Sequence, residues 1–276
     1  MINKHKEALI VNSIGASFFT MLYTKKIFNS DTKDWVVFIH GAGGSSAVWY
    51  QQVKPFSEKF NVLLLDLRGH GKSKMNSDSK NYSFKMIAED VLETLKENQI
   101  ELAHFVGVSM GSIIIKQIYS LSPKTVKSMV FAGAVTELNF KSRLLLRIGR
   151  IFNNVLPYMT LYIIFARVMM PRKNHEQSRQ LFIREAKKLM DKEFKRWFKL
   201  TARLTAYLAE LEKNKFKIPT LYIMGGEDHL FLTPVRKLVK NDNFSQLSVI
   251  ADCGHVVNVE NSLVFNELSI DFIERN

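Results

Sequence analysis

Cysteine is almost absent from this sequence, which has 276 residues and a single cysteine, Cys253. No intrachain disulfide can form, and nothing in the cysteine usage points to an oxidising compartment. Repeats and low-complexity linkers are also absent, and 46% of the residues are apolar. A disordered chain is therefore excluded, and the length is sufficient for one large core or a core with an inserted subdomain.

Long apolar runs are missing as well. The longest mostly apolar stretch, residues 155–166, is flanked by Arg150 and Arg167 and is shorter than the roughly 20 residues that a membrane span needs. A short apolar run at residues 8–11 follows basic residues, but polar residues interrupt it and no convincing signal-peptide cleavage site follows. We predict that residues 8–11 and 18–23 form a hairpin instead, in a cytoplasmic protein that could also contact a membrane peripherally.

Acidic residues are scarce in one segment. Residues 141–217 hold 19 of the 39 basic residues but only 6 of the 26 acidic ones, and this segment accounts for the whole net charge of +13. The positive charge is thus a property of one element and not of the entire fold. For the protein as a whole we expect a small-molecule substrate and no nucleic-acid partner.

Apolar segments of strand length alternate with helical patterns along most of the chain. This alternation predicts an α/β fold with a mostly parallel sheet and right-handed crossovers. The predicted strands are residues 35–39, 61–65, 104–108, 127–133, 219–225 and 247–250, and the predicted helices are residues 47–59, 83–98, 112–119 and 263–275.

One interval interrupts this alternation. Between Gly133 and Pro219 there is no clear strand, and roughly three helical patterns fill the gap. Its position after a strand places it at the carboxyl end of the sheet, where ligands bind in open α/β sheets, so we interpret it as a lid. The expected organisation is a core of residues 1–135 and 215–276, with a basic helical lid of residues 136–214 inserted after the sixth strand.

A sharp turn follows the strand of residues 104–108. It carries the pattern Gly107-Val108-Ser109-Met110-Gly111 between a short apolar strand and a long apolar helix. This G-x-S-x-G pattern favours a strained turn that exposes the serine hydroxyl, because a side chain at either glycine would collide with neighbouring backbone. It also leaves the Met110 N–H, at the start of the following helix, free to donate to an oxyanion.

A serine nucleophile needs a base and a carboxylate that orients the base. Downstream of Ser109 the chain offers Asp228 just past one predicted strand and His255 just past the next. The order Ser, Asp, His with each residue at a strand end predicts one shared site. Glu227 competes with Asp228 for the carboxylate role, His229 complicates the assignment, and Glu137 is a more remote alternative.

Four separate motifs together resemble the α/β-hydrolase fold superfamily, and in particular its lidded bacterial serine esterases and lipase-like hydrolases. They occur in family order over nearly the whole chain: His40-Gly41-Ala42-Gly43-Gly44, the turn of residues 66–73, the serine turn, and the loop of residues 254–261. The resemblance implies a catalytic triad of Ser109, His255 and Asp228. It also implies an oxyanion hole in which the backbone N–H of Ala42 joins that of Met110.

The implied activity is that of a serine hydrolase, which cleaves carboxylic esters through an acyl-enzyme and uses no metal or cofactor. Phenylalanine, leucine, isoleucine and methionine are frequent in the lid, which favours an apolar or lipid-like acyl group. Thioesterase, amidase and carbon-carbon bond hydrolase chemistry use the same triad and stay open. The histidines outside the triad show no metal-ligand spacing.

Two rival interpretations remain. One is a nucleotide-binding oxidoreductase, because the glycine-rich run of residues 41–46, with Asp66 after the next strand, imitates a dinucleotide-binding fingerprint; however, Ser46 stands at the third glycine position. The basic lid could alternatively serve as a non-catalytic binding surface, for nucleic acid or for an anionic membrane. Residues 144–152 have amphipathic helical spacing with arginines on the polar side, so peripheral membrane contact or a homodimer through the lid helices is also a possible addition to an enzyme.

Overall fold

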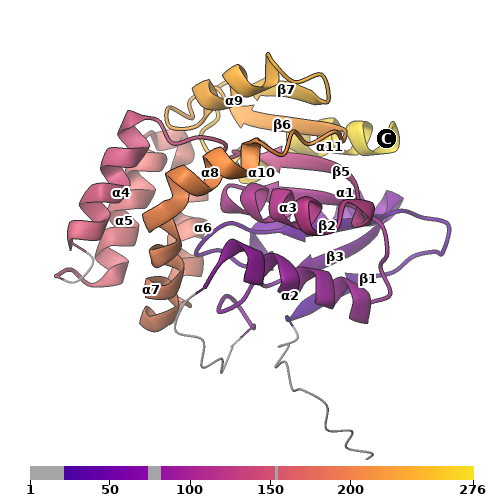
Figure 1. Ribbon diagram of the computed structural model, residues 1–276, viewed down its shortest axis with the longest axis horizontal. Coiled ribbons are helices and arrows are strands. Elements are labelled where there is room, and N and C mark those ends of the chain that lie inside the picture. The colour runs from indigo at the N-terminus through magenta and orange to yellow at the C-terminus, as the bar shows by residue number, and fades with distance from the viewer. Residues whose placement is uncertain (1–21, 74–81, 153–154) are drawn as a thin grey trace, which may run out of the picture.

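A seven-stranded sheet forms the centre of the protein, as the computed structural model shows (Figure 1). The structure describes residues 22–73, 82–152 and 155–276. The strand order is β1-β3-β2-β4-β5-β6-β7, and every neighbouring pair is parallel except β1 and β3. The strands are β1 (Thr24–Ile27), β2 (Trp35–Ile39), β3 (Asn61–Leu65), β4 (Ala103–Val108), β5 (Val126–Ala132), β6 (Thr220–Gly225) and β7 (Ser245–Ile250).

The mostly parallel sheet predicted from the alternating pattern is confirmed, and the six strands predicted after residue 30 match β2 to β7 within a few residues. The expected hairpin falls mainly on residues 1–21, which lie outside the described residues. The first described strand is β1, so the helical insertion follows β5 in the numbering of the structure.

Helices flank the sheet. They are α1 (Val53–Lys59), α2 (Phe84–Glu97), α3 (Met110–Leu121), α9 (Leu232–Val239), α10 (Val257–Glu260) and α11 (Ser262–Glu274). The helix α2 begins where the Ser83 hydroxyl accepts the Met86 N–H at 3.1 Å, and its Ile87, Val91 and Leu95 are buried. This helix packs against α3, and α1 packs against α11. Because β2 to β6 are apolar on both faces, the helices bury them almost completely.

The insertion contains five α-helices within the described residues, where the sequence pattern predicted roughly three. They are α4 (Phe140–Phe152), α5 (Tyr158–Met169), α6 (Glu176–Ala186), α7 (Asp191–Leu200) and α8 (Leu204–Glu212), and we call them the lid helices. Short 3₁₀ turns separate several of them, and the apolar run of residues 155–166 is divided because Pro157 is the N-cap of α5. Periodicity alone does not show such closely spaced breaks.

Buried carboxylates attach the lid helices to the sheet and its flanking helices, which together we call the sheet domain. Glu185 accepts a hydrogen bond from the Ser45 hydroxyl at 2.6 Å, and Glu193 accepts one from the Tyr82 hydroxyl at 2.5 Å. The Trp197 indole N–H also donates to the Arg68 carbonyl at 3.0 Å. Two of the few acidic residues of the lid therefore face inward, which leaves its outer surface still more basic.

Within the described ranges, no helix has both the length and the apolar character needed to cross a membrane.

Candidate active site

Ser109 lies at the tight turn between β4 and α3. Its backbone has φ 54° and ψ −119°, a left-handed conformation that is costly for a residue with a side chain. The turn is possible because Gly111 has no side chain: a Cβ there would come within 2.4 Å of the Ile39 carbonyl oxygen. At Gly107 a Cβ would come within 2.5 Å of the Ile115 side chain. The predicted collision with backbone is confirmed at Gly111, whereas at Gly107 the closest atom is the end of the Ile115 side chain and the nearest backbone atom, the Gly111 carbonyl carbon, is 3.0 Å away.

His255 and Asp228 converge on this serine from two loops of the sheet domain. The His255 Nε2 atom lies 2.9 Å from the Ser109 Oγ, and its Nδ1 atom lies 2.8 Å from the Asp228 Oδ2. The other carboxylate oxygen of Asp228 accepts the N–H groups of Leu230 and Phe231 at 3.2 and 3.0 Å. Because a carboxylate accepts and does not donate, it fixes the proton of His255 on Nδ1 and leaves Nε2 free to take the serine proton.

The alternative carboxylates lie elsewhere. Glu227 contacts His175 Nε2 at 2.7 Å and pairs with Arg172, both in the lid. Glu137 and His229 have exposed side chains. Of the carboxylates weighed from the sequence, Asp228 is therefore the one that the fold brings to His255.

Two neutral histidines hold the loop of residues 40–46, which we call the oxyanion loop, beside the serine. The Leu67 N–H donates to His40 Nε2 and the Gly43 N–H donates to His70 Nε2, both at 2.9 Å. Burial lowers the pKa of His40, and burial together with neighbouring His40 lowers the pKa of His70 to about 3. Both rings therefore stay neutral near pH 7 and can accept these N–H groups. This agrees with the expected bracing role of His40.

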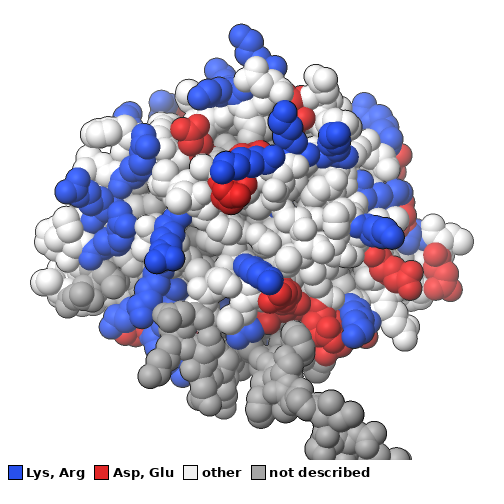
Figure 2. All heavy atoms as spheres, viewed as in Figure 1, with Lys and Arg blue, Asp and Glu red and all other residues white. Residues whose placement is uncertain are grey.

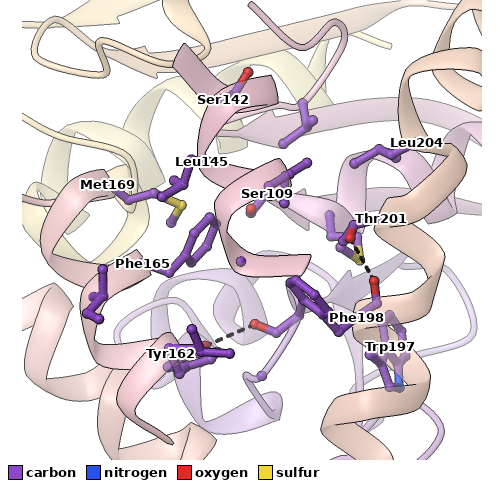
Figure 3. A pocket seen from close by; sticks show the side chains of 18 of the residues that line it. Ser109, Ser142, Leu145, Tyr162, Phe165, Met169, Trp197, Phe198, Thr201 and Leu204 are labelled. Carbon is purple, nitrogen blue, oxygen red and sulfur yellow. Dashed lines mark hydrogen bonds between the residues drawn. The ribbon is translucent and has the colours of Figure 1, made fainter. Parts of the chain in front are cut away.

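Tyr162 supports the same loop from the lid. Its buried hydroxyl donates to the Ala42 carbonyl at 3.2 Å, and its ring packs against Gly43, which has φ 74° (Figure 3). Among the described residues, neither the Ala42 N–H nor the Met110 N–H has a hydrogen-bond acceptor. The expected oxyanion donors are thus available for another acceptor.

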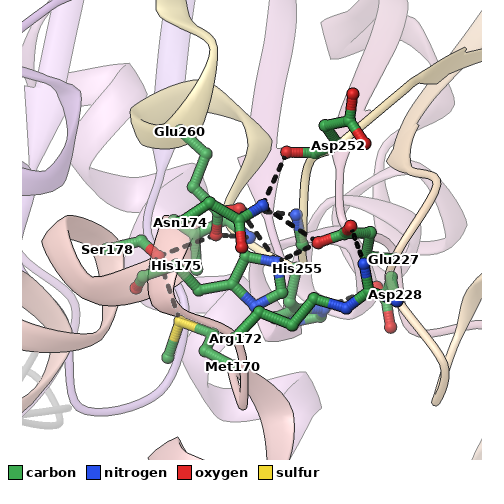
Figure 4. A network of polar contacts seen from close by, with 12 residues as sticks. Met170, Arg172, Asn174, His175, Ser178, Glu227, Asp228, Asp252, His255 and Glu260 are labelled. Atoms are coloured by element: carbon green, nitrogen blue, oxygen red, sulfur yellow. Dashed lines mark hydrogen bonds and ion pairs between the residues drawn. The ribbon is translucent and has the colours of Figure 1, made fainter.

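A polar network joins the lid to the loops that carry His255 and Asp228 (Figure 4). The Glu260 carboxylate accepts the N–H of Gly254, next to His255 in the chain, and the hydroxyl of the lid residue Ser178 at 2.7 Å. His175 of the lid is fully buried, contacts Glu227 and lies 3.8 Å from Glu260. The lid is therefore bonded to Glu227, next to Asp228 in the chain, and to Glu260, which in turn accepts the N–H of Gly254 next to His255.

A cavity of about 400 Å³ lies between Ser109 and the lid helices. Figure 3 shows aromatic and aliphatic side chains of the lid around the serine. The lining is almost entirely apolar; it includes Leu145, Phe165, Met169, Phe182, Phe198, Leu204 and Phe231. The volume falls within the range of about 300–1,000 Å³ that is typical of small-molecule sites.

The residues that imitate a dinucleotide fingerprint have structural partners. Asp66 is buried, and its two carboxylate oxygens accept the N–H groups of Ser46 at 2.7 Å and Lys72 at 2.8 Å. This carboxylate is therefore occupied by its own loops and is not directed at a ribose. Cys253 is also buried, which raises the pKa of its thiol, so it is unsuited to act as a nucleophile.

The chain belongs to the α/β hydrolase fold family, whose model matches residues 34–262. Among curated proteins it is similar to the RutD protein of Stutzerimonas stutzeri (strain A1501), whose name proposes a carbamate hydrolase. The two are 26% identical over 247 residues, which cover 86% of this chain and 91% of that one.

Solved structures share the fold. A hydrolase from Oleispira antarctica superposes with a TM-score of 0.82 at 19% identity, covering 94% of this chain and 96% of its own. Est816, described as an N-acyl homoserine lactone degrading enzyme, superposes with a TM-score of 0.74 at 24% identity, covering 91% of this chain and 96% of its own. By family this chain is therefore an α/β hydrolase.

Several residues of the site escaped sequence reasoning. Tyr162, Glu260, His175 and His70 carry no motif of their own that marks them as partners of the triad or of the oxyanion loop. A useful signal was available for Glu260, which lies inside the loop of residues 254–261 that carries His255 and, as a carboxylate, needs a partner when buried.

Proposed function

We propose that the protein is a serine hydrolase that cleaves carboxylic esters with apolar acyl groups. The observation that carries the proposal is the continuous contact from Asp228 through His255 to Ser109, which opens into an apolar cavity. We also propose that residues 136–214 act as a lid over a core of residues 1–135 and 215–276.

In the proposed mechanism, Ser109 Oγ attacks the ester carbonyl while His255 Nε2 takes the serine proton. The Ala42 and Met110 N–H groups stabilise the negative oxygen of the tetrahedral intermediate. Its collapse breaks the ester bond, and the departing alcohol takes the proton from His255. Water then gives a proton to His255 and attacks the acyl-enzyme, which releases the acid and returns the proton to Ser109. Asp228 stabilises the imidazolium in both halves.

The cavity lining supports an apolar acyl group in this mechanism. A chain of methylene groups gains about 0.8 kcal/mol for each one removed from water, and almost no polar groups line the cavity to bind a polar acid. A small polar substrate such as a carbamate would leave much of this surface without a matching partner. The cavity therefore favours esters of aliphatic or aromatic acids.

The test is the specificity constant for p-nitrophenyl esters of increasing acyl length. We expect kcat/KM to rise with length until the cavity is full and to vanish in Ser109→Ala. Activity confined to acetate and butyrate would contradict the acyl-pocket assignment. Thioesters, amides and carbon-carbon substrates need the same triad, so the acyl series should be repeated with thioesters to rank the leaving groups.

A further inference from the structure

The outer face of the lid exposes large apolar side chains in a regular arrangement. We call these residues the apolar strip: Phe140, Leu144, Ile148 and Ile151 of α4 with Ile164 and Val168 of α5. The α4 members recur at i, i+4, i+8 and i+11, so they share one side of the helix. Exposure is 74% at Phe140 and 63% at Ile151, and these side chains would be costly to leave in water.

Positive charge lies directly beside this strip. Arg143, Arg147 and Arg150 follow the i, i+4, i+7 spacing on the neighbouring side of α4, and residues 138–175 contain no aspartate or glutamate. In the part of the chain that the structure describes, Arg143 and Arg147 form no salt bridge. Figure 2 shows basic side chains gathered over the lid helices, on the left of the view.

We propose that this face of the lid binds the surface of an anionic lipid bilayer. An amphipathic helix with an apolar face and arginines beside it lies in the plane of a membrane interface, where its apolar residues enter the acyl boundary and its cations meet anionic headgroups. The surface thus has both contributions that this mode of binding requires, and none of the helices in the described part of the chain is long and apolar enough to span the bilayer.

Other partners fit this surface less well. A second copy of the chain docked here by two-fold symmetry would place the same cationic segment against itself, with no acidic residue in 138–175 to oppose it. Nucleic-acid sites are polar, so the isoleucines and phenylalanine of the apolar strip would gain little on a phosphate backbone. Charge complementarity therefore favours the bilayer.

The surface leads to the cavity. Ile148 and Ile164 line the cavity and are also 44% and 47% exposed, so they lie at its rim. Docking would accordingly set the cavity rim against the lipid phase, so that an apolar acyl ester could pass from the bilayer to Ser109. This last step rests on the proposed function, whereas membrane binding itself does not.

The experiment measures co-sedimentation of the full-length Ser109→Ala protein with vesicles. We expect the partition coefficient on phosphatidylcholine vesicles with about 30% phosphatidylglycerol to exceed that on pure phosphatidylcholine at least tenfold, and to fall in high salt. Reversing Arg143 and Arg147 to glutamate should lower it at least about tenfold. So should Leu144→Asp with Ile151→Asp, two positions outside the cavity lining.

The matched control reverses Arg236 and Lys237, two exposed cations of α9, to glutamate. It makes the same change in net charge and should leave binding unchanged. Equal binding to neutral and anionic vesicles, or equal loss in the control, would overturn the proposal. A dimer seen by sedimentation and dissolved by Leu144→Asp, without vesicle binding, would also overturn it. Vesicle binding is measured in Ser109→Ala and does not depend on catalysis. If the unaltered protein showed no esterase activity, that result would refute the proposed function but not membrane binding.

Discussion

Removing the Tyr162 hydroxyl should slow catalysis without touching the triad. In Tyr162→Phe, the Ala42 carbonyl loses its 3.2 Å hydrogen bond while the ring still packs on Gly43. One neutral hydrogen bond contributes about 0.5–1.5 kcal/mol. If all of it is lost in the transition state, kcat falls about two- to tenfold, since 1.36 kcal/mol is a factor of ten. The loss should stay well below the roughly 100- to 1,000-fold caused by deleting an oxyanion donor.

The assay is steady-state hydrolysis of p-nitrophenyl butyrate, with kcat and KM measured separately. Tyr158→Phe is the control. The Tyr158 hydroxyl, also on α5, donates a hydrogen bond to a backbone carbonyl, that of Leu189 at 2.8 Å, but it does not contact the loop of residues 40–46. We expect kcat to fall in Tyr162→Phe with little change in KM, and Tyr158→Phe to keep the original kcat. Equal kcat losses in both variants would refute the argument that Tyr162 positions the loop.

Three further predictions concern other parts of the site. Asp228→Asn should lower kcat by about three to four orders of magnitude, measured with the same ester, because an amide can hold His255 in the wrong tautomer; a loss below tenfold would contradict its role. Glu260→Gln should lower both the melting temperature and kcat, because the buried Gly254 N–H and Ser178 hydroxyl lose their charged acceptor; unchanged values would contradict the coupling of lid and triad. The pKa of His70 is about 3 in the folded protein against an ordinary 6.5. Between these pH values the unfolded chain binds a proton that the folded protein does not. The contribution of His70 to the free energy of unfolding is therefore complete above about pH 6.5 and declines as the pH falls towards 3. Urea unfolding at pH 5 should therefore show about 2 kcal/mol less stability from this residue than at pH 7.5, and His70→Gln should reduce that pH dependence.

The sheet and the convergence of Ser109, His255 and Asp228 were predictable because their signals are local. A buried parallel strand is an apolar run, and the turn after β4 is marked by the G-x-S-x-G pattern, whose residues lie within five positions of one another. The order of Ser109, Asp228 and His255, each just after a strand, then suffices to place them at one edge of the sheet. The structure adds the contact distances, 2.9 Å between His255 and Ser109 and 2.8 Å between His255 and Asp228.

The supporting residues were not predictable because their partners are remote in sequence. Tyr162 meets Ala42 across 120 residues, and Ser45 meets Glu185 across 140. No local pattern marks which lid tyrosine reaches the oxyanion loop, since Tyr158 lies one helical turn away. The number of lid helices was underestimated for a related reason: breaks at 3₁₀ turns depend on how each helix packs against the sheet domain.

The most direct test of the central claim is covalent labelling with a fluorophosphonate followed by peptide mass spectrometry. The account predicts one stoichiometric adduct on Ser109, with labelling abolished in Ser109→Ala and strongly slowed in His255→Ala. An adduct on another residue, or a folded protein that hydrolyses esters at the original rate after Ser109→Ala, would contradict it.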